Sequence, residues 1–147
     1  MAGVLDHGDL HAKADTKIGY AVFPRIAHRG NLAFHTALAK ATRHEYAVGA
    51  IEQHGPHLPL ATDTIIAEEL AGRAVHHTDG LMIGPTISVS ASGEHAGFPG
   101  TLSIGSAVMT SVIVELARSA DWAAGVVLVN GHGGNHAAIS EAVAIVT

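Results

Sequence analysis

Residues 125–147, GVVLVNGHGGNHAAISEAVAIVT, combine three patterns in immediate succession. The first five are a continuous aliphatic and β-branched run, which is typical of a strand buried on both faces. A glycine-rich turn over residues 130–135 follows. From residue 136 to the end, the apolar residues recur at helical spacing. A strand, a tight turn and a helix in this order form the repeating unit of a parallel α/β sheet.

The same strand-then-helix pattern occurs earlier in the chain. Residues 47–51, AVGAI, form a short apolar run that predicts a buried strand. A polar loop follows it, and we expect a helix over residues 64–77. Thr62 or Asp63 is the expected N-cap of that helix, because both residue types accept hydrogen bonds from backbone N–H groups at helix starts.

A third unit lies between these two. Residues 81–89, LMIGPTISV, are a strand candidate whose second half is weakened by Pro85. Residues 107–120 then predict a helix that ends in Arg118, a basic residue near the helix C-terminus. The alternation of strands and helices predicts an α/β fold with a mostly parallel sheet.

Composition excludes several classes of protein. The chain has 147 residues, 48% hydrophobic and 14% charged, which fits one globular domain and excludes intrinsic disorder. No apolar run approaches the ~20 residues that span a bilayer, so we expect no membrane partner. Cysteine is absent and the net charge is -5, which disfavours disulfide scaffolds and nucleic-acid partners. We expect a cytoplasmic protein with 12 histidines available for metal or proton chemistry.

The chain divides near residue 45. Residues 1–45 hold most of the Lys and Arg residues and show no sustained period, so they are left unassigned apart from a short helix expected over residues 32–42. Residues 46–147 carry the regular α/β pattern and an excess of acidic residues. The sequence therefore predicts a poorly assigned N-terminal segment followed by one α/β domain.

The loop after the first predicted strand holds potential metal ligands. It reads EQHGPHLPLATD over residues 52–63. Glu52 and His54 lie two residues apart, so an extended backbone points both side chains to one face. The glycine and the two prolines that lie between His54 and Asp63 form a stiff turn, which can bring Asp63 back toward that face. One imidazole between two carboxylates is typical of a zinc, iron or manganese site. A hydrogen-bonded polar loop is an equally good interpretation.

Two further loops are expected at the same edge of the sheet, where parallel folds bind ligands. The turn after the last strand carries His132 among glycines, and it could instead bind an anion at the start of the following helix. The loop over residues 90–101 carries Glu94 and His95. These two side chains are candidates to face a substrate, although surface polar residues on a glycine-rich loop explain them as well.

Three motifs together resemble the creatininase family of metal-dependent amidohydrolases. They are IEQHGPHLPLATDT at residues 51–64, GFPGTLSIG at residues 97–105 and VLVNGHGGN at residues 127–135. The similarity covers about residues 47–147. The segment SGEHAGFPGTLSIG is most similar to the creatininase-like peptidases of mycofactocin biosynthesis.

The resemblance implies a three-layer α/β/α sandwich with a centre of two divalent metal ions, zinc and/or iron, with manganese as a further possibility. By position, Glu52 and His132 would bind one ion, His54 the other, and Asp63 would bridge both. Such a pair of ions activates a water molecule and polarises an amide carbonyl.

The implied substrate is a small amide or a peptide. The mycofactocin-type reaction removes a C-terminal dipeptide from a modified precursor peptide. His57, Glu94 and His95 are the substrate-facing candidates. Other creatininase-family members act on a cyclic amide such as creatinine or on formamides, and an inactive, truncated metal-binding remnant is the non-enzymatic alternative. The resemblance also implies a homo-oligomer for the full-length protein.

The sequence departs from the family pattern at two points that bear on function. Creatininase itself carries a ligand glutamate two residues after the histidine of its NGH motif, where this chain has Gly134, which disfavours creatinine as the substrate. The family also continues past Thr147 with further His and Glu groups, so the catalytic groups are expected beyond this residue. We therefore expect a fold that is incomplete at the C-terminus, with residues 125–129 partly uncovered, low solubility and little amidase activity.

Overall fold

The computed structural model of the chain describes residues 19–24 and 42–147, which form a four-stranded sheet. The strands, in the spatial order β1-β4-β2-β3, are β1 (Gly19–Pro24), β2 (Arg43–Val48), β3 (Leu81–Ile83) and β4 (Gly125–Asn130). β2 is parallel to both β3 and β4, whereas β1 runs antiparallel to β4. The sheet is mostly parallel, as the sequence predicts.

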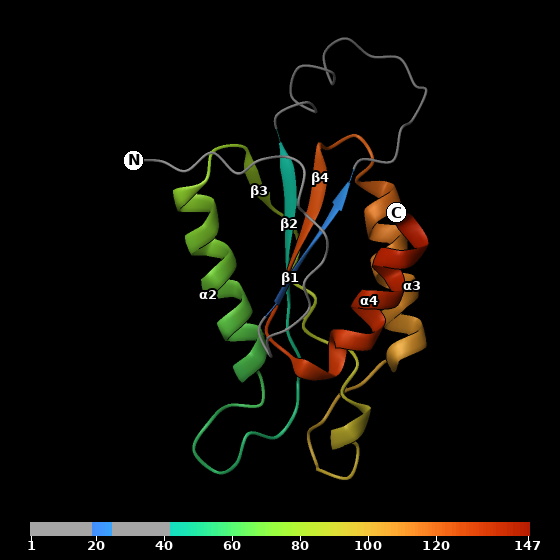
Figure 1. The fold of residues 1–147 in the computed structure, drawn as a ribbon. Helices are drawn as coiled ribbons and strands as arrows, with labels where there is room; N and C mark the ends of the chain where they lie inside the picture. Colours follow the sequence, from blue (N-terminus) through green and yellow to red (C-terminus); the bar gives the residue numbers. More distant parts are fainter. Residues whose placement is uncertain (1–18, 25–41) are drawn as a thin grey trace.

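Helices cover both faces of the sheet. Figure 1 shows α2 (Thr62–His77) on one side and α3 (Ser106–Ser119) with α4 (His136–Val146) on the other. Two short 3₁₀ turns, η1 (Gly93–His95) and η2 (Gly133–Asn135), are the remaining elements of the described residues. Within the described residues, no helix is long and apolar enough to cross a bilayer.

The side chains of β2 alternate between the two helical layers, as the strand period requires. Tyr46 and Val48 belong to the larger cluster, which contains the buried Met109 and Ile113 of α3. Ala47 points the other way, into a small cluster formed with α2. The predicted three-layer α/β/α architecture is confirmed.

The predicted helices agree with the observed ones to within one or two residues at each end, whereas two strands differ more. β2 begins at Arg43, before the apolar run 47–51 that predicted it. Polar residues at its start concealed the strand. The predicted strand 81–89 narrows to Leu81–Ile83, because Pro85 has no N–H to offer. Backbone pairing resumes beyond it, where the Ile87 N–H donates to the Ala47 carbonyl at 2.9 Å.

β1 was not expected from the sequence, and it changes the surroundings of β4. This strand lies in the segment left unassigned, and it pairs along the whole of β4. The expectation that residues 125–129 form an uncovered apolar edge is therefore wrong, since β4 lies between β1 and β2. The helix expected over residues 32–42 falls outside the described residues, apart from Thr42.

Parallel pairing places the carboxyl ends of β2, β3 and β4 at one edge of the sheet. The loops that follow these strands gather at the bottom of Figure 1. This edge is where the sequence places its candidate ligands, and where open α/β sheets bind ligands.

Candidate metal centre

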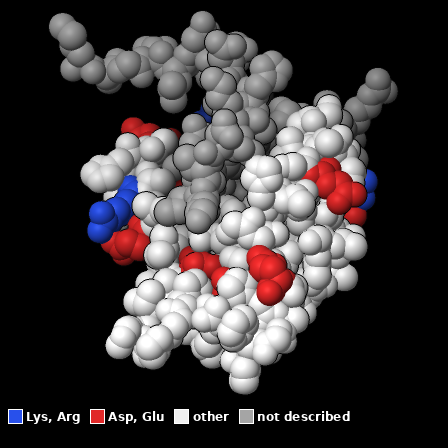
Figure 2. Space-filling model, turned by 60° about the horizontal axis from the view of Figure 1, so that its bottom comes forward, with Lys and Arg blue, Asp and Glu red and all other residues white. Residues whose placement is uncertain are grey.

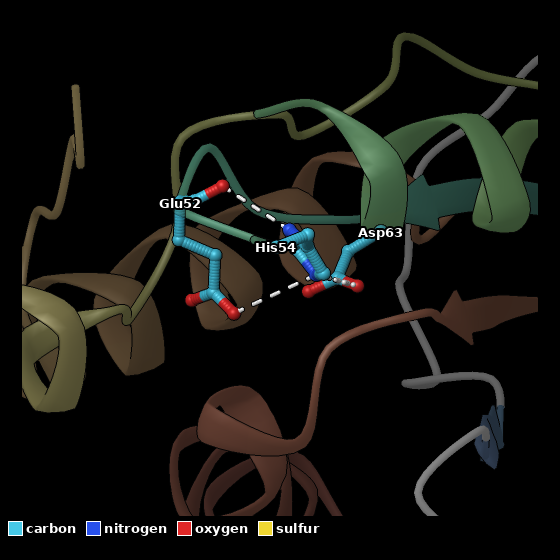
Figure 3. A group of neighbouring side chains, drawn as sticks. All are labelled: Glu52, His54 and Asp63. Atoms are coloured by element: carbon cyan, nitrogen blue, oxygen red, sulfur yellow. Dashed lines mark hydrogen bonds and ion pairs between the residues drawn. The ribbon is translucent and has the colours of Figure 1, made fainter. Parts of the chain in front are cut away.

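The loop after β2 folds back on itself and brings Glu52, His54 and Asp63 together (Figure 3). The Glu52 N–H donates to the Leu60 carbonyl at 3.0 Å, which closes the loop. The Thr64 hydroxyl donates to the Ala50 carbonyl at 3.0 Å and fixes the first turn of α2 beside it. The return of Asp63 toward Glu52 and His54 therefore follows the sequence prediction.

His54 presents a lone pair to two carboxylates. Its Nδ1 lies 3.1 Å from the Glu52 carbonyl oxygen, an acceptor, so Nδ1 carries the proton. In the neutral ring, Nε2 then has a free lone pair, yet it lies 2.9 Å from Asp63 Oδ1 and 3.9 Å from Glu52 Oε1. Lone pairs that face one another require a proton or a metal ion between them.

His132 lies at the opposite side of Asp63. Its Nδ1 is 2.9 Å from Asp63 Oδ2, so each oxygen of this buried carboxylate contacts a different imidazole. Its Nε2 is 3.4 Å from Glu52 Oε2 and 3.1 Å from the Ala91 carbonyl. Both ring nitrogens of His132 thus face oxygen acceptors. This environment suits an imidazolium or a metal-bound imidazole.

Glycine at position 131 permits the close approach of the turn after β4 to the first turn of α2. A Cβ at Gly131 would clash with the backbone oxygen of Asp63 in the first turn of α2. The side chain of Asn130 then fixes the turn from within, since its amide donates to the His132 carbonyl at 2.8 Å and its oxygen accepts the His132 N–H at 3.3 Å.

The loop after β3 supplies the remaining polar groups. His95 Nε2 lies 3.5 Å from Glu52 Oε1, and its Nδ1 accepts the Gln53 amide at 3.2 Å. His95 therefore carries its proton on Nε2, toward Glu52. Glu94 Oε1 lies 3.3 Å from His132 Nε2. His57, the third substrate-facing candidate, is exposed on the first loop and forms no hydrogen bond or ion pair within the described residues.

Within the described residues, no Lys or Arg side chain pairs with the carboxylates of the cluster. Glu52, Asp63 and Glu94 bring three carboxylates together, and the buried Glu52 Oε2 has no hydrogen-bond partner among the described residues. Among residues 42–147, Arg73 pairs with Glu69 and Arg118 with Glu115, whereas Arg43 begins β2, at the opposite edge of the sheet from the site. Figure 2 shows Asp and Glu atoms near the centre of the molecule in this view, with Lys and Arg atoms at its left and right margins. The donor set and its charge fit divalent cations.

One predicted detail is wrong. Neither Thr62 nor Asp63 caps α2, because Ala61 occupies the N-cap and no side chain bonds there. The Asp63 carboxylate turns instead to His54 and His132, whose imidazoles lie at hydrogen-bonding distance.

Sequence reasoning also missed two groups, Ser92 and Asn135. Ser92 Oγ lies 3.4 Å from His132 Nε2, and Asn135 is fully buried behind the site. The second asparagine of the NGHGGN motif was the available signal for Asn135.

The site lies within a match to a known family. The family model described as creatinine amidohydrolase matches residues 27–147. The chain belongs to the creatininase family. Its sequence is 42% identical over 134 residues to the mycofactocin precursor peptide peptidase of Mycolicibacterium smegmatis. The match covers 81% of this chain and 54% of the relative. The Mycobacterium tuberculosis protein of the same name is 46% identical over 108 residues, 67% of this chain and 43% of the relative.

More distant creatininase-family members share the fold. The creatinine amidohydrolase of Pseudomonas putida is 34% identical over 105 residues, 65% of this chain and 39% of that protein. A crystal structure of creatininase matches with a TM-score of 0.66 and 25% identity, over 78% of this chain and 48% of that one. A manganese form of creatininase gives a TM-score of 0.65 at 25% identity, over 78% and 49%. The chain thus spans about half the length of the proteins it matches.

Proposed function

We propose that this chain carries the metal centre of a peptidase that hydrolyses a C–N amide bond of the mycofactocin precursor peptide and releases a C-terminal dipeptide. The observation that carries the proposal is Asp63, whose two oxygens each lie 2.9 Å from a different imidazole beside the buried Glu52. The substrate is supported by 42% and 46% identity to mycofactocin precursor peptide peptidases, against 34% to creatinine amidohydrolase.

Four residues would hold two divalent ions in this proposal. Glu52 and His132 would bind one, His54 the other, and Asp63 would bridge them; each carboxylate oxygen of Asp63 faces a separate histidine. When bound, such ions supply an activated water and a polarised amide carbonyl. The hydrogen bond from His54 Nδ1 to the Glu52 carbonyl fixes that ring with Nε2 toward the site.

The identity of the ions belongs to the same proposal. Carboxylate and imidazole donors accept zinc, iron and manganese alike. Solved creatininases include a manganese form and a Zn-Zn form. We propose zinc and/or iron here, with manganese as an effective substitute.

The rim of the site supports a peptide substrate. Leu58 and Leu60 on the first loop and Phe98 and Leu102 on the second are 41–54% exposed. Apolar side chains of a bound peptide would cover this surface at about 25 cal/mol per Å² buried. His95 and His57 would then face its polar groups. A small cyclic amide such as creatinine, the alternative that the P. putida relative favours, would leave the rim uncovered, and so would a formamide.

A cytoplasmic location and assembly into a homo-oligomer complete the proposal and stay predictions. Light scattering on the purified protein measures the second directly. A monomer at micromolar concentration would count against it.

The deciding experiment uses the protein expressed from its gene, with any coding sequence that follows Thr147. The metal-free protein is loaded with Zn²⁺, Fe²⁺ or Mn²⁺ and incubated with the modified precursor peptide or with creatinine. Mass spectrometry should detect a released C-terminal dipeptide only in the metal-loaded samples, and creatinine should persist. Turnover of creatinine with the peptide left intact would refute the peptidase proposal and favour the alternative.

A further inference from the structure

Glu94 lies against the metal-binding side of His132. Its Oε1 is 3.3 Å from His132 Nε2, and Glu52 Oε2 is 3.4 Å from the same nitrogen. The donor atoms of Glu52, Glu94 and His132 all lie within 4.8 Å of one another, so these three residues form a second candidate metal group beside that of Glu52, His54 and Asp63.

These separations match donors that share one ion. Ligands bound at about 2.0–2.1 Å to a tetrahedral zinc ion lie about 3.3–3.4 Å from each other. We infer that Glu94 is a metal ligand, which adds a third protein donor to the ion held by Glu52 and His132. This inference rests on the proposed metal centre, and it gives Glu94 a different role from the substrate-facing one that the sequence suggests.

The charge around Glu52 supports a cation at this place. Glu52 is 4% exposed, and within residues 19–24 and 42–147 its Oε2 has no hydrogen-bond partner, although it lies 3.4 Å from His132 Nε2. A buried, unpaired carboxylate oxygen is unfavourable unless a cation or a donor compensates it. An ion between Glu52, Glu94 and His132 would compensate the negative charge of that oxygen and of the Glu94 carboxylate together.

Gly134 leaves the space that Glu94 occupies. A Cβ at position 134 would clash with Glu94 Oε1 and with His132 Nε2. The backbone on both sides of Glu94 is fixed: the Ser92 N–H donates to the Ser103 hydroxyl at 3.0 Å, and the Thr101 hydroxyl donates to the His95 carbonyl at 2.9 Å. Glu94 is thus held beside His132, while its side chain remains 47% exposed for the ion to enter.

The test compares metal binding by the wild-type chain, Glu94→Gln and the control Glu115→Gln. Glu115 is an exposed glutamate that pairs with Arg118 on α3, away from the site. The metal-free proteins are titrated with Mn²⁺ or Zn²⁺ by calorimetry, and the ions retained per chain are measured by elemental analysis after desalting. Since loss of even an outer-shell partner weakens metal affinity 10–100-fold, Glu94→Gln should weaken one site by about 100-fold or lose one ion.

The outcomes separate this inference from the proposed function. Glu115→Gln should behave like wild type, and circular dichroism should show that Glu94→Gln is folded; if it is not, Glu94→Asp, which shortens the reach by one methylene, takes its place. Wild-type binding of two ions with unchanged affinity in the Glu94 variant overturns the inference and leaves the metal centre intact. Absence of metal binding by the wild-type chain overturns both.

Discussion

Replacement of Glu45 by Met should stabilise the protein at neutral and alkaline pH. Glu45 lies in the middle of β2 with 1% of its surface exposed. By strand alternation it points to the α2 face, as Ala47 does. Neither of its carboxylate oxygens has a hydrogen-bond partner in the part of the chain that the structure describes. Burial without a partner raises the pKa of this carboxyl group, because the charged form loses its hydration.

The expected gain follows from proton linkage. The carboxyl binds its proton more tightly in the folded than in the unfolded chain, so its contribution to stability is fully present below the unfolded pKa and is lost as pH rises through the folded pKa. A buried polar group without a partner costs about 1–3 kcal/mol, and more when it is charged. Glu45→Met should therefore raise the free energy of unfolding by about 1–3 kcal/mol above the folded pKa, and by less near pH 4.5.

Urea denaturation at a series of pH values measures this difference. Glu45→Gln separates the two causes, since it removes the charge and leaves an unpaired amide, and it should show the same pH trend with a smaller gain. Met in place of the exposed Glu115 should change stability by no more than about 0.5 kcal/mol. A Glu45→Met protein that is less stable than wild type at pH 8, or whose gain grows toward acid, would show that the carboxylate is compensated in solution.

Three further predictions concern the metal centre. Gly134→Ala should lower metal affinity about 10–100-fold, because its Cβ would displace Glu94 and His132. Gly133→Ala is the control and should leave the affinity unchanged, since a Cβ at position 133 meets no atom within 4 Å. Calorimetric titration compares the two variants. Asp63→Ala should reduce the ions retained per chain more than any other single ligand replacement, and full metal content by elemental analysis would refute the bridging role. Chelation should lower thermal stability, since ions at 100 times their Kd contribute about 2.7 kcal/mol, and an unchanged melting temperature would contradict this.

The regular elements near the C-terminal half could be predicted because their patterns are local. The apolar run of β4 and the helical spacing of α4 lie within one continuous stretch of sequence. β1 could not be predicted in this way, because its position depends on pairing with β4, far along the chain, where Gly19 pairs with Asn130. The start of β2 was hidden for a different reason, since Glu45 is a charged residue that the structure buries.

The site was predictable where its spacing is short. Glu52, His54 and Asp63 lie on one loop whose turn residues constrain it, so the sequence alone places them together. The proximity of Glu94 to His132 has no local signal, because it depends on how two loops from separate strands pack at the edge of the sheet. The same holds for Ser92, whose contact with His132 crosses 40 residues of sequence.

The framework of the site is built from residues other than the candidate ligands. The fully buried Asn135 joins three segments: its amide donates to the Gly49 carbonyl and to the Asn130 side chain, both at 3.1 Å, and its oxygen accepts the Ala91 N–H at 3.0 Å. The Ser90 hydroxyl adds a bond to the same Gly49 carbonyl at 2.6 Å. None of these bonds involves a carboxylate of the candidate ligands. Replacement of a ligand should therefore remove metal while the loops keep their places, so that metal content reports on ligation rather than on folding.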